Sequence, residues 1–160
     1  MTTIPTLTHV NADGLPGMVD VSTKPVTARR ALAVAEVVFP PEVLAALRAA
    51  GWNTKKGAVF QTAIIAGTQA VKATSTLIPF CHPLPIDSVR FSHTETDDGI
   101  RIACEVHATY RTGVEMEALT GASIAALTVI DMCKALSHAI AIRSVRLLEK
   151  SGGKREVRQP

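Results

Sequence analysis

Hydrophobic and polar positions alternate in the middle of the chain. From Ile100 to Arg111, apolar residues at every second position are separated by mostly polar ones, which is typical of a strand with one face in a core. A second predicted strand, over residues 88–96, precedes it. The connecting Asp97-Asp98-Gly99 is suited to a hairpin turn. The sequence therefore predicts two neighbouring antiparallel strands.

Between Thr112 and Leu136, apolar residues recur at the longer spacing that is typical of a helix. From about Met116 the residues are strong helix formers, so we expect one long helix. The apolar residues that recur at the spacing of one buried stripe are Leu119, Ile124, Leu127 and Ile130.

This predicted helix carries charged residues at both ends. Glu115 and Glu117 stand at its start, and Asp131 and Lys134 stand near its end. At about 1.5 Å per residue, Glu117 and Asp131 lie roughly 20 Å apart, farther than one small-molecule pocket usually reaches. Either there are two sites, or a second copy of the chain packs antiparallel and brings both ends together, and we favour the second. Alternatively, the acids only complement the helix dipole, and Asp131 and Lys134 form an exposed ion pair.

The other predicted elements complete an α+β pattern. They are a strand over 29–39, a short helix over 42–50, a helix beginning near Gly57 and a last strand over 139–148. The expected buried face of the helix that begins near Gly57 consists of Phe60, Ile64, Gly67 and Val71. The order is β-α-(α)-β-β-α-β, which is ferredoxin-like: an antiparallel sheet with helices packed on one face.

The chain of 160 residues is the size of one domain, and 47% hydrophobic residues are enough for a core. We expect a flexible N-terminal segment over 1–28, a single domain over 29–150 and a flexible C-terminal tail over 151–160. Only 4% of residues are aromatic, and the net charge of +3 is spread along the chain. Both features favour an anionic small ligand over nucleic acid.

Three cysteines, Cys81, Cys104 and Cys133, are an odd number without CxxC spacing, and no signal peptide precedes them. We therefore expect reduced thiols and a cytoplasmic location. No apolar run reaches the roughly 20 residues that a membrane span needs, so no membrane association is expected.

Three short motifs are candidates for ligand binding. Lys55-Lys56-Gly57 precedes a predicted helix, where free N–H groups and a cation would attract phosphate, although a solvated lysine pair is the alternative. Prolines fix the loop around Cys81 and His82, in which His82 could serve as acid, base or hydrogen-bond donor. No pair of histidines has zinc spacing. Arg29-Arg30 could clamp a phosphate or mark the solvent side of a strand.

Several longer motifs stand in one order along nearly the whole chain. They are Met18-Val19-Asp20-Val21-Ser22, Lys56-Gly57, residues 65–70, residues 77–84, residues 112–120, residues 131–135 and Ser151-Gly152-Gly153-Lys154. With this combination the chain closely resembles the molybdenum cofactor biosynthesis protein C family, the cyclic pyranopterin monophosphate synthases.

The resemblance implies a ferredoxin-like lyase of the phosphorus-oxygen type, with residues 29–150 as a single catalytic domain. It implies conversion of (8S)-3',8-cyclo-7,8-dihydroguanosine 5'-triphosphate to cyclic pyranopterin monophosphate, with release of diphosphate. It also implies a homo-hexamer, a trimer of dimers, with sites at subunit interfaces. The alternative is a non-catalytic ferredoxin-like module that binds a nucleotide or regulates.

Matched motif by motif, the resemblance gives Lys56 and Lys134 the acid and base roles, with Asp131 beside Lys134. The substrate-binding residues that it implies are Cys81, His82, Glu115, Met116, Glu117, Arg29 and Lys72. Arg29 and Lys72 would face the triphosphate. No metal site and no cofactor are expected, although a divalent cation such as Mg²⁺ could accompany the triphosphate.

Overall fold

The computed structural model describes residues 14–159. Of the N-terminal segment that the sequence predicts to be flexible, residues 1–13 lie outside this range. Residues 14–26 run as a loop, with a turn in which Lys24 N donates to Val21 O at 3.0 Å. This loop leads directly into the first strand.

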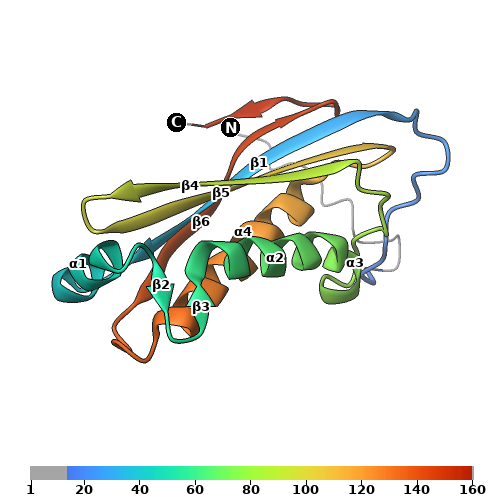
Figure 1. The fold of residues 1–160 in the computed structure, drawn as a ribbon. Coiled ribbons are helices and arrows are strands. Elements are labelled where there is room, and N and C mark those ends of the chain that lie inside the picture. The colour runs from blue at the N-terminus through green and yellow to red at the C-terminus, as the bar shows by residue number, and fades with distance from the viewer. Residues whose placement is uncertain (1–13, 160) are drawn as a thin grey trace.

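Five strands form one antiparallel sheet in the order β4-β5-β1-β6-β7 (Figure 1). Their bounds are β1 Thr27–Val38, β4 Ser88–Thr96, β5 Gly99–Tyr110, β6 Ala141–Ser151 and β7 Val157–Arg158. The four long strands have the order and direction of the predicted ferredoxin-like plan. The hairpin of β4 and β5 agrees with its prediction to within one residue.

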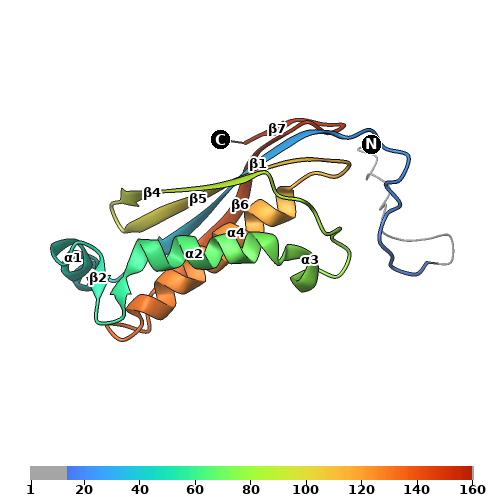
Figure 2. The same ribbon diagram turned by 45° about the vertical axis from the view of Figure 1, so that its right-hand side comes forward.

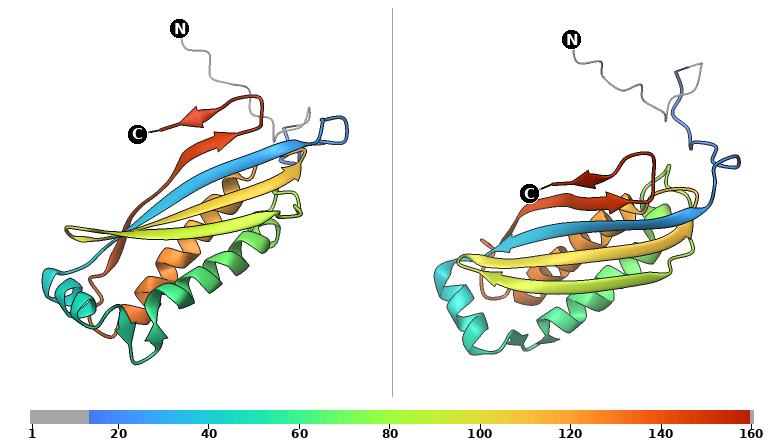
Figure 3. Two further views of the ribbon diagram at one scale, coloured as in Figure 1. Left: turned by 45° about the horizontal axis from the view of Figure 1, so that its top comes forward. Right: turned by 90° about the horizontal axis from the view of Figure 1, so that it is seen from above.

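Two long helices lie side by side beneath one face of the sheet (Figure 2). The helices are α1 Pro41–Ala49, α2 Val59–Lys72, α3 Thr74–Leu77 and α4 Glu115–Cys133, and a small hairpin is formed by β2 Asn53–Thr54 and β3 Gly57–Ala58. In the described part of the chain, the opposite face of the sheet carries no helix (Figure 3). The predicted α+β class, with helices on one face, is confirmed.

The fully buried face of α4 consists mainly of small residues, so the predicted stripe of large ones is only partly right: Leu119 and Ile130 pack against the core from partly buried positions. Its fully buried positions include Ala118, Ala122, Ala125, Ala126 and Val129. Leu127 is 53% exposed, and the other predicted stripe residues are only partly buried. Small residues are needed because the helix lies very close to its neighbours: a Cβ at Gly121 would come within 2.7 Å of Cys104 Sγ on β5.

Small residues also form the closest contacts of α2. Gly67 and Val71 are buried as predicted, but Ile64 is 36% exposed, and Ala63 takes the buried place beside it. A Cβ at Gly67 would lie only 2.9 Å from Gly121 O, so the two long helices are in close contact there. Several larger apolar side chains of the two helices, among them Ile64, Ile65 and Leu127, are exposed.

By length and composition alone, α4 is apolar enough to cross a membrane. However, more than half of it is buried inside the fold, where it packs against α2, β1, β5 and β6. This is the pattern of a core helix.

The predicted flexible tail contains a short strand. β7 pairs with β6, with Val157 opposite Lys150 and Arg158 opposite Glu149. Gln159 N donates to Leu148 O at 2.8 Å. Residues 157–159 thus run alongside β6.

Candidate active site

Three charged side chains meet at the C-terminal end of α4. Lys134 Nζ lies 2.8 Å from Asp131 Oδ1, and Lys56 Nζ lies 2.9 Å from Asp131 Oδ2. Lys56 Nζ also donates to the carbonyl oxygen of Asp131 at 2.8 Å. The two ammonium groups, that of Lys134 first, lower the pKa of Asp131 to about 2. The carboxylate therefore stays ionised and contacts both lysines, one through each oxygen.

Lys56 reaches this cluster from the loop of the β2–β3 hairpin, which lies beside the end of α4 (Figure 1). The hairpin pairs Asn53 with Ala58 and Thr54 with Gly57. Lys56 N donates to Thr54 Oγ1 at 3.2 Å. The lysine therefore precedes α2, as predicted, but its ammonium group contacts a carboxylate of α4.

An open cavity of about 780 Å³ lies at the other end of α4. Its walls come from the N-terminal loop, the loop after α3, the start of α4 and the end of β6. Six of the predicted substrate-binding residues line it: Arg29, Cys81, His82, Glu115, Met116 and Glu117. The volume is in the range of small-molecule sites. Lys72 is exposed in the last turn of α2 and does not line the cavity.

Two carboxyl groups at the start of α4 have different surroundings. Glu115 Oε1 accepts a hydrogen bond from Lys150 Nζ at 2.6 Å. Glu117 is only 4% exposed, and its burial, with a smaller effect from the Glu115 charge, raises its pKa to about 7. Such a carboxyl group can accept or release a proton at neutral pH. Burial, and second the Glu117 carboxylate, raise the pKa of the Cys81 thiol, which disfavours its reactive thiolate.

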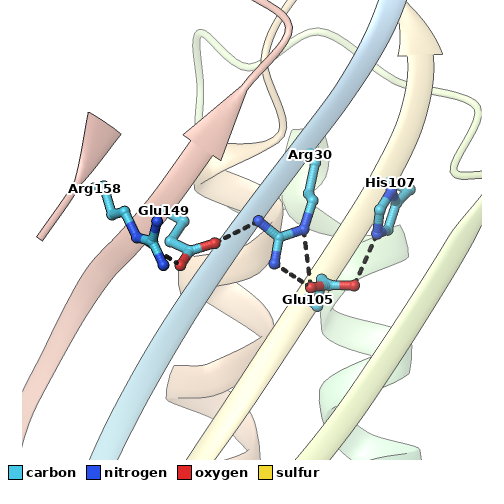
Figure 4. Close-up of polar contacts among 5 residues, drawn as sticks. All are labelled: Arg30, Glu105, His107, Glu149 and Arg158. Carbon is cyan, nitrogen blue, oxygen red and sulfur yellow. Dashed lines mark hydrogen bonds and ion pairs between the residues drawn. The ribbon is translucent and has the colours of Figure 1, made fainter. Parts of the chain in front are cut away.

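Arg29 and Arg30 point to opposite faces of β1, because neighbouring strand residues alternate. Arg29 lines the cavity and donates to Tyr110 O and Arg111 O, both at 3.3 Å. Arg30 lies in an ion-pair network on the other face (Figure 4), together with Glu105, His107, Glu149 and Arg158. The two arginines therefore cannot clamp one phosphate together.

Four cations that the sequence analysis did not assign also line the cavity: Lys24, Arg111, Lys150 and Lys154. The last two come from the Ser-Gly-Gly-Lys region. Gly152 allows it to turn, because its φ is +87° and a Cβ there would lie 1.8 Å from Ala28 O. The Gly-Gly pair was thus a signal of a tight turn against β1. Arg111 Nε is buried, with no hydrogen-bond partner among residues 14–159.

The lysine–carboxylate cluster and the cavity are not brought together within one chain. They stand at opposite ends of α4, whose 19 residues span roughly 27 Å. The Lys56–Asp131–Lys134 cluster does not line the cavity that holds Glu115 and Glu117. Within the described range, no group of three or more His, Cys, Asp or Glu side chains is placed to hold a metal ion.

This geometry defines a ferredoxin-like protein with a cationic small-molecule cavity and a separate lysine–carboxylate cluster. The sequence profile of the MoaC family matches residues 18–153, and the chain belongs to that family. The resemblance seen in the sequence motifs is confirmed.

Some relatives of this chain match it over nearly their whole length, and others are much longer proteins of which it covers only a part. It is 58% identical over 157 residues to the cyclic pyranopterin monophosphate synthase of Xanthomonas campestris pv. campestris (strain B100), covering 98% of this chain and 95% of that protein. It is 48% identical to the molybdenum cofactor biosynthesis bifunctional protein of Synechocystis sp., covering 95% and 45%. It is 47% identical to molybdenum cofactor biosynthesis protein 1 of Dictyostelium discoideum, covering 91% and 26%.

Proposed function

We propose that this chain is a cyclic pyranopterin monophosphate synthase of molybdenum cofactor biosynthesis. Its substrate is then (8S)-3',8-cyclo-7,8-dihydroguanosine 5'-triphosphate, and its products are cyclic pyranopterin monophosphate and diphosphate. The observation that carries the proposal is the 58% identity to the Xanthomonas synthase over 98% of this chain. The cationic cavity supports it, because a triphosphate needs several positive partners.

Lys56 and Lys134 act as the acid and base in this proposal. Forming a cyclic monophosphate with release of diphosphate requires one group to take the proton of the attacking hydroxyl and another to stabilise the leaving oxygen. The two ammonium groups that share Asp131 are close enough to divide these tasks. Asp131 orients both.

The cavity residues bind the substrate. Arg29 faces the triphosphate, while His82, Glu115, Met116 and Glu117 orient the base and sugar. Cys81 lines the wall without a covalent role, because a raised thiol pKa disfavours the nucleophilic form. Lys72 stands outside the cavity wall at the end of α2, and we keep it as a contact to the triphosphate.

A complete site contains two chains. The cavity end of α4 in one subunit meets the Lys56–Asp131–Lys134 cluster of a neighbour, and three such dimers form a hexamer. The separation of the two clusters along α4 supports this arrangement. The outward apolar residues of the helix layer also support it, since unburied surface of this kind favours association. They include Ile64, Ile65 and Leu127.

We propose no protein-held cofactor, since side chains supply the acid, the base and the anion-binding groups. A divalent cation such as Mg²⁺ would arrive with the triphosphate. We also propose a cytoplasmic location, with neither membrane nor nucleic acid as partner. Three free cysteines fit a reducing compartment.

The test is turnover of the cyclised triphosphate by the purified chain, followed by mass spectrometry of the pterin product and by an enzyme-coupled diphosphate assay. We expect equal amounts of both products. Binding of the triphosphate without release of diphosphate would instead favour the non-catalytic module.

A further inference from the structure

The β2–β3 hairpin that carries Lys56 is too short to fix its own position. Each of its strands has two residues, and Lys55 and Lys56 form the connecting loop. Even longer isolated two-stranded hairpins are only marginally stable in water. Contacts outside the hairpin must therefore determine where the Lys56 ammonium group stands.

Trp52 anchors the base of this hairpin. Its side chain is only 6% exposed, and its ring contacts those of Phe39 and Phe60, with centroid distances of 5.6 and 4.8 Å. Val59 N donates to the carbonyl oxygen of Trp52 at 3.0 Å and closes the hairpin. The φ of Trp52 is +58°, in the left-handed region, which a bulky residue adopts only when its surroundings impose it.

Glu95 on β4 orients the indole. Trp52 Nε1 donates to Glu95 Oε1 at 2.9 Å, and Arg48 Nε donates to Glu95 Oε2 at 2.6 Å. These hydrogen bonds, that of Trp52 first, hold the pKa of Glu95 below its usual value, so the acceptor is a carboxylate. The ion pair with Arg48 is exposed and adds little stability by itself. Its effect is to fix the direction of the carboxylate.

We propose that Trp52 and Glu95 are positioning residues for Lys56. They act at the base of the hairpin, whereas at its loop Lys56 contacts Asp131. Neither Trp52 nor Glu95 lines the cavity, so their hydrogen bond is placed to act through the lysine. The inference rests on the proposed function, in which Lys56 is an acid or base. A displacement of such a group by about 1 Å can reduce the rate about 100-fold.

The kinetic test compares two substitutions at one position. Glu95→Leu removes the acceptor for the indole N–H, and we expect kcat to fall about tenfold with KM within about twofold. Glu95→Gln retains an acceptor oxygen and is expected to restore most of the lost rate. In a Lys56→Ala background, Glu95→Leu is expected to add no further loss, because both changes act on one group. Asp98→Leu, which removes another exposed ion pair, is the matched control.

A second readout does not depend on activity. Trp52 is the single tryptophan of the chain, so its fluorescence reports this contact directly. We expect Glu95→Leu to shift the emission and to accelerate hydrogen exchange in residues 53–58, while Glu95→Gln changes both less. If the wild type releases no diphosphate, the proposed function fails, and the exchange measurement still decides whether Glu95 orders the hairpin.

Three results would overturn the positioning role while leaving the proposed function intact. One is an unchanged kcat in Glu95→Leu when Lys56→Ala sharply lowers kcat. Another is unchanged exchange in residues 53–58. The third is an equal additional loss in the Lys56→Ala background, which would mean that Glu95 acts by a route other than Lys56.

Discussion

The two ends of α4 carry carboxyl groups in opposite surroundings. At the N-terminal end, Glu117 is 4% exposed, and its burial raises its pKa to about 7. At the C-terminal end, the Asp131 side chain is 53% exposed between two lysines, which lower its pKa to about 2. Similar groups on one helix therefore have different chemistry because of burial and neighbouring charge.

The comparison shows that each end has what the other lacks. The N-terminal end has a cavity of substrate size and a carboxyl group that can exchange a proton near neutrality. The C-terminal end has a permanently ionised carboxylate that holds two lysines. A site that needs both requires the two ends of different chains to meet.

The largest expected effect is on kcat, at the exposed C-terminal end of α4. Lys134→Ala removes a proposed acid or base, so we expect kcat to fall by about 100-fold or more. The melting temperature is expected to stay the same, because the side chain is half exposed. Diphosphate release and thermal unfolding measure the two quantities. Lys55→Ala, one residue before Lys56 on the same hairpin, is the control and is expected to retain activity; a comparable loss there would point to bulk charge.

An intermediate effect, on the free energy of unfolding, is expected at the N-terminal end of α4, where Glu117 is buried. Glu117 has a folded-state pKa of about 7 against an ordinary value of 4.5, so its burial lowers stability progressively as the pH rises from about 4.5 to 7. Glu117→Gln avoids this ionisation. We expect it to raise the free energy of unfolding by on the order of 3 kcal/mol at pH 8 and little at pH 4.

Urea unfolding at pH 4, 6 and 8, at one protein concentration, measures this difference. The same variant is expected to bind substrate less well, since Glu117 lines the cavity. An equal stabilisation at pH 4 and pH 8 would show that the charge of Glu117 is not the cause.

The smallest effect on stability is expected for Asp131→Asn. The ion pairs of Asp131 are exposed, and such pairs contribute little to folding. Because its folded-state pKa lies below the ordinary value of 3.8, this small contribution is present above about pH 4 and is lost as the pH falls towards 2. We expect no measurable change in unfolding at pH 7, but a lower kcat. A large loss of stability would mean that the cluster has a structural role.

Local periodicity predicted most of the fold. The alternation in β5 identified the core face correctly from Ile100 to Ala108, because a strand with one buried face must repeat every two residues. The buried face of α4 was missed because close contact between helices selected alanine and glycine over leucine. Side-chain size is set by the neighbouring element, which a single sequence does not display.

The sequence motifs named candidate site residues but did not show how the fold arranges them. The motifs named Lys56, Asp131 and Lys134, yet the β2–β3 hairpin that delivers Lys56 has strands too short to leave a periodic signal. Lys150, and the cavity position of Lys154, were missed because both depend on pairing between segments far apart in sequence. Thr27 Oγ1, for example, donates to Gly152 O at 2.9 Å.

Mixing two inactive variants tests the shared site most directly. Glu115→Ala chains and Lys134→Ala chains are refolded together, and formation of mixed oligomers is checked by native mass spectrometry. If each site combines Glu115 of one chain with Lys134 of another, a mixed dimer has one intact site of two. Equal random mixing then restores about a quarter of wild-type activity. A chain with both substitutions, mixed with either single variant, restores none. Mixed oligomers without activity at any ratio would contradict the shared site.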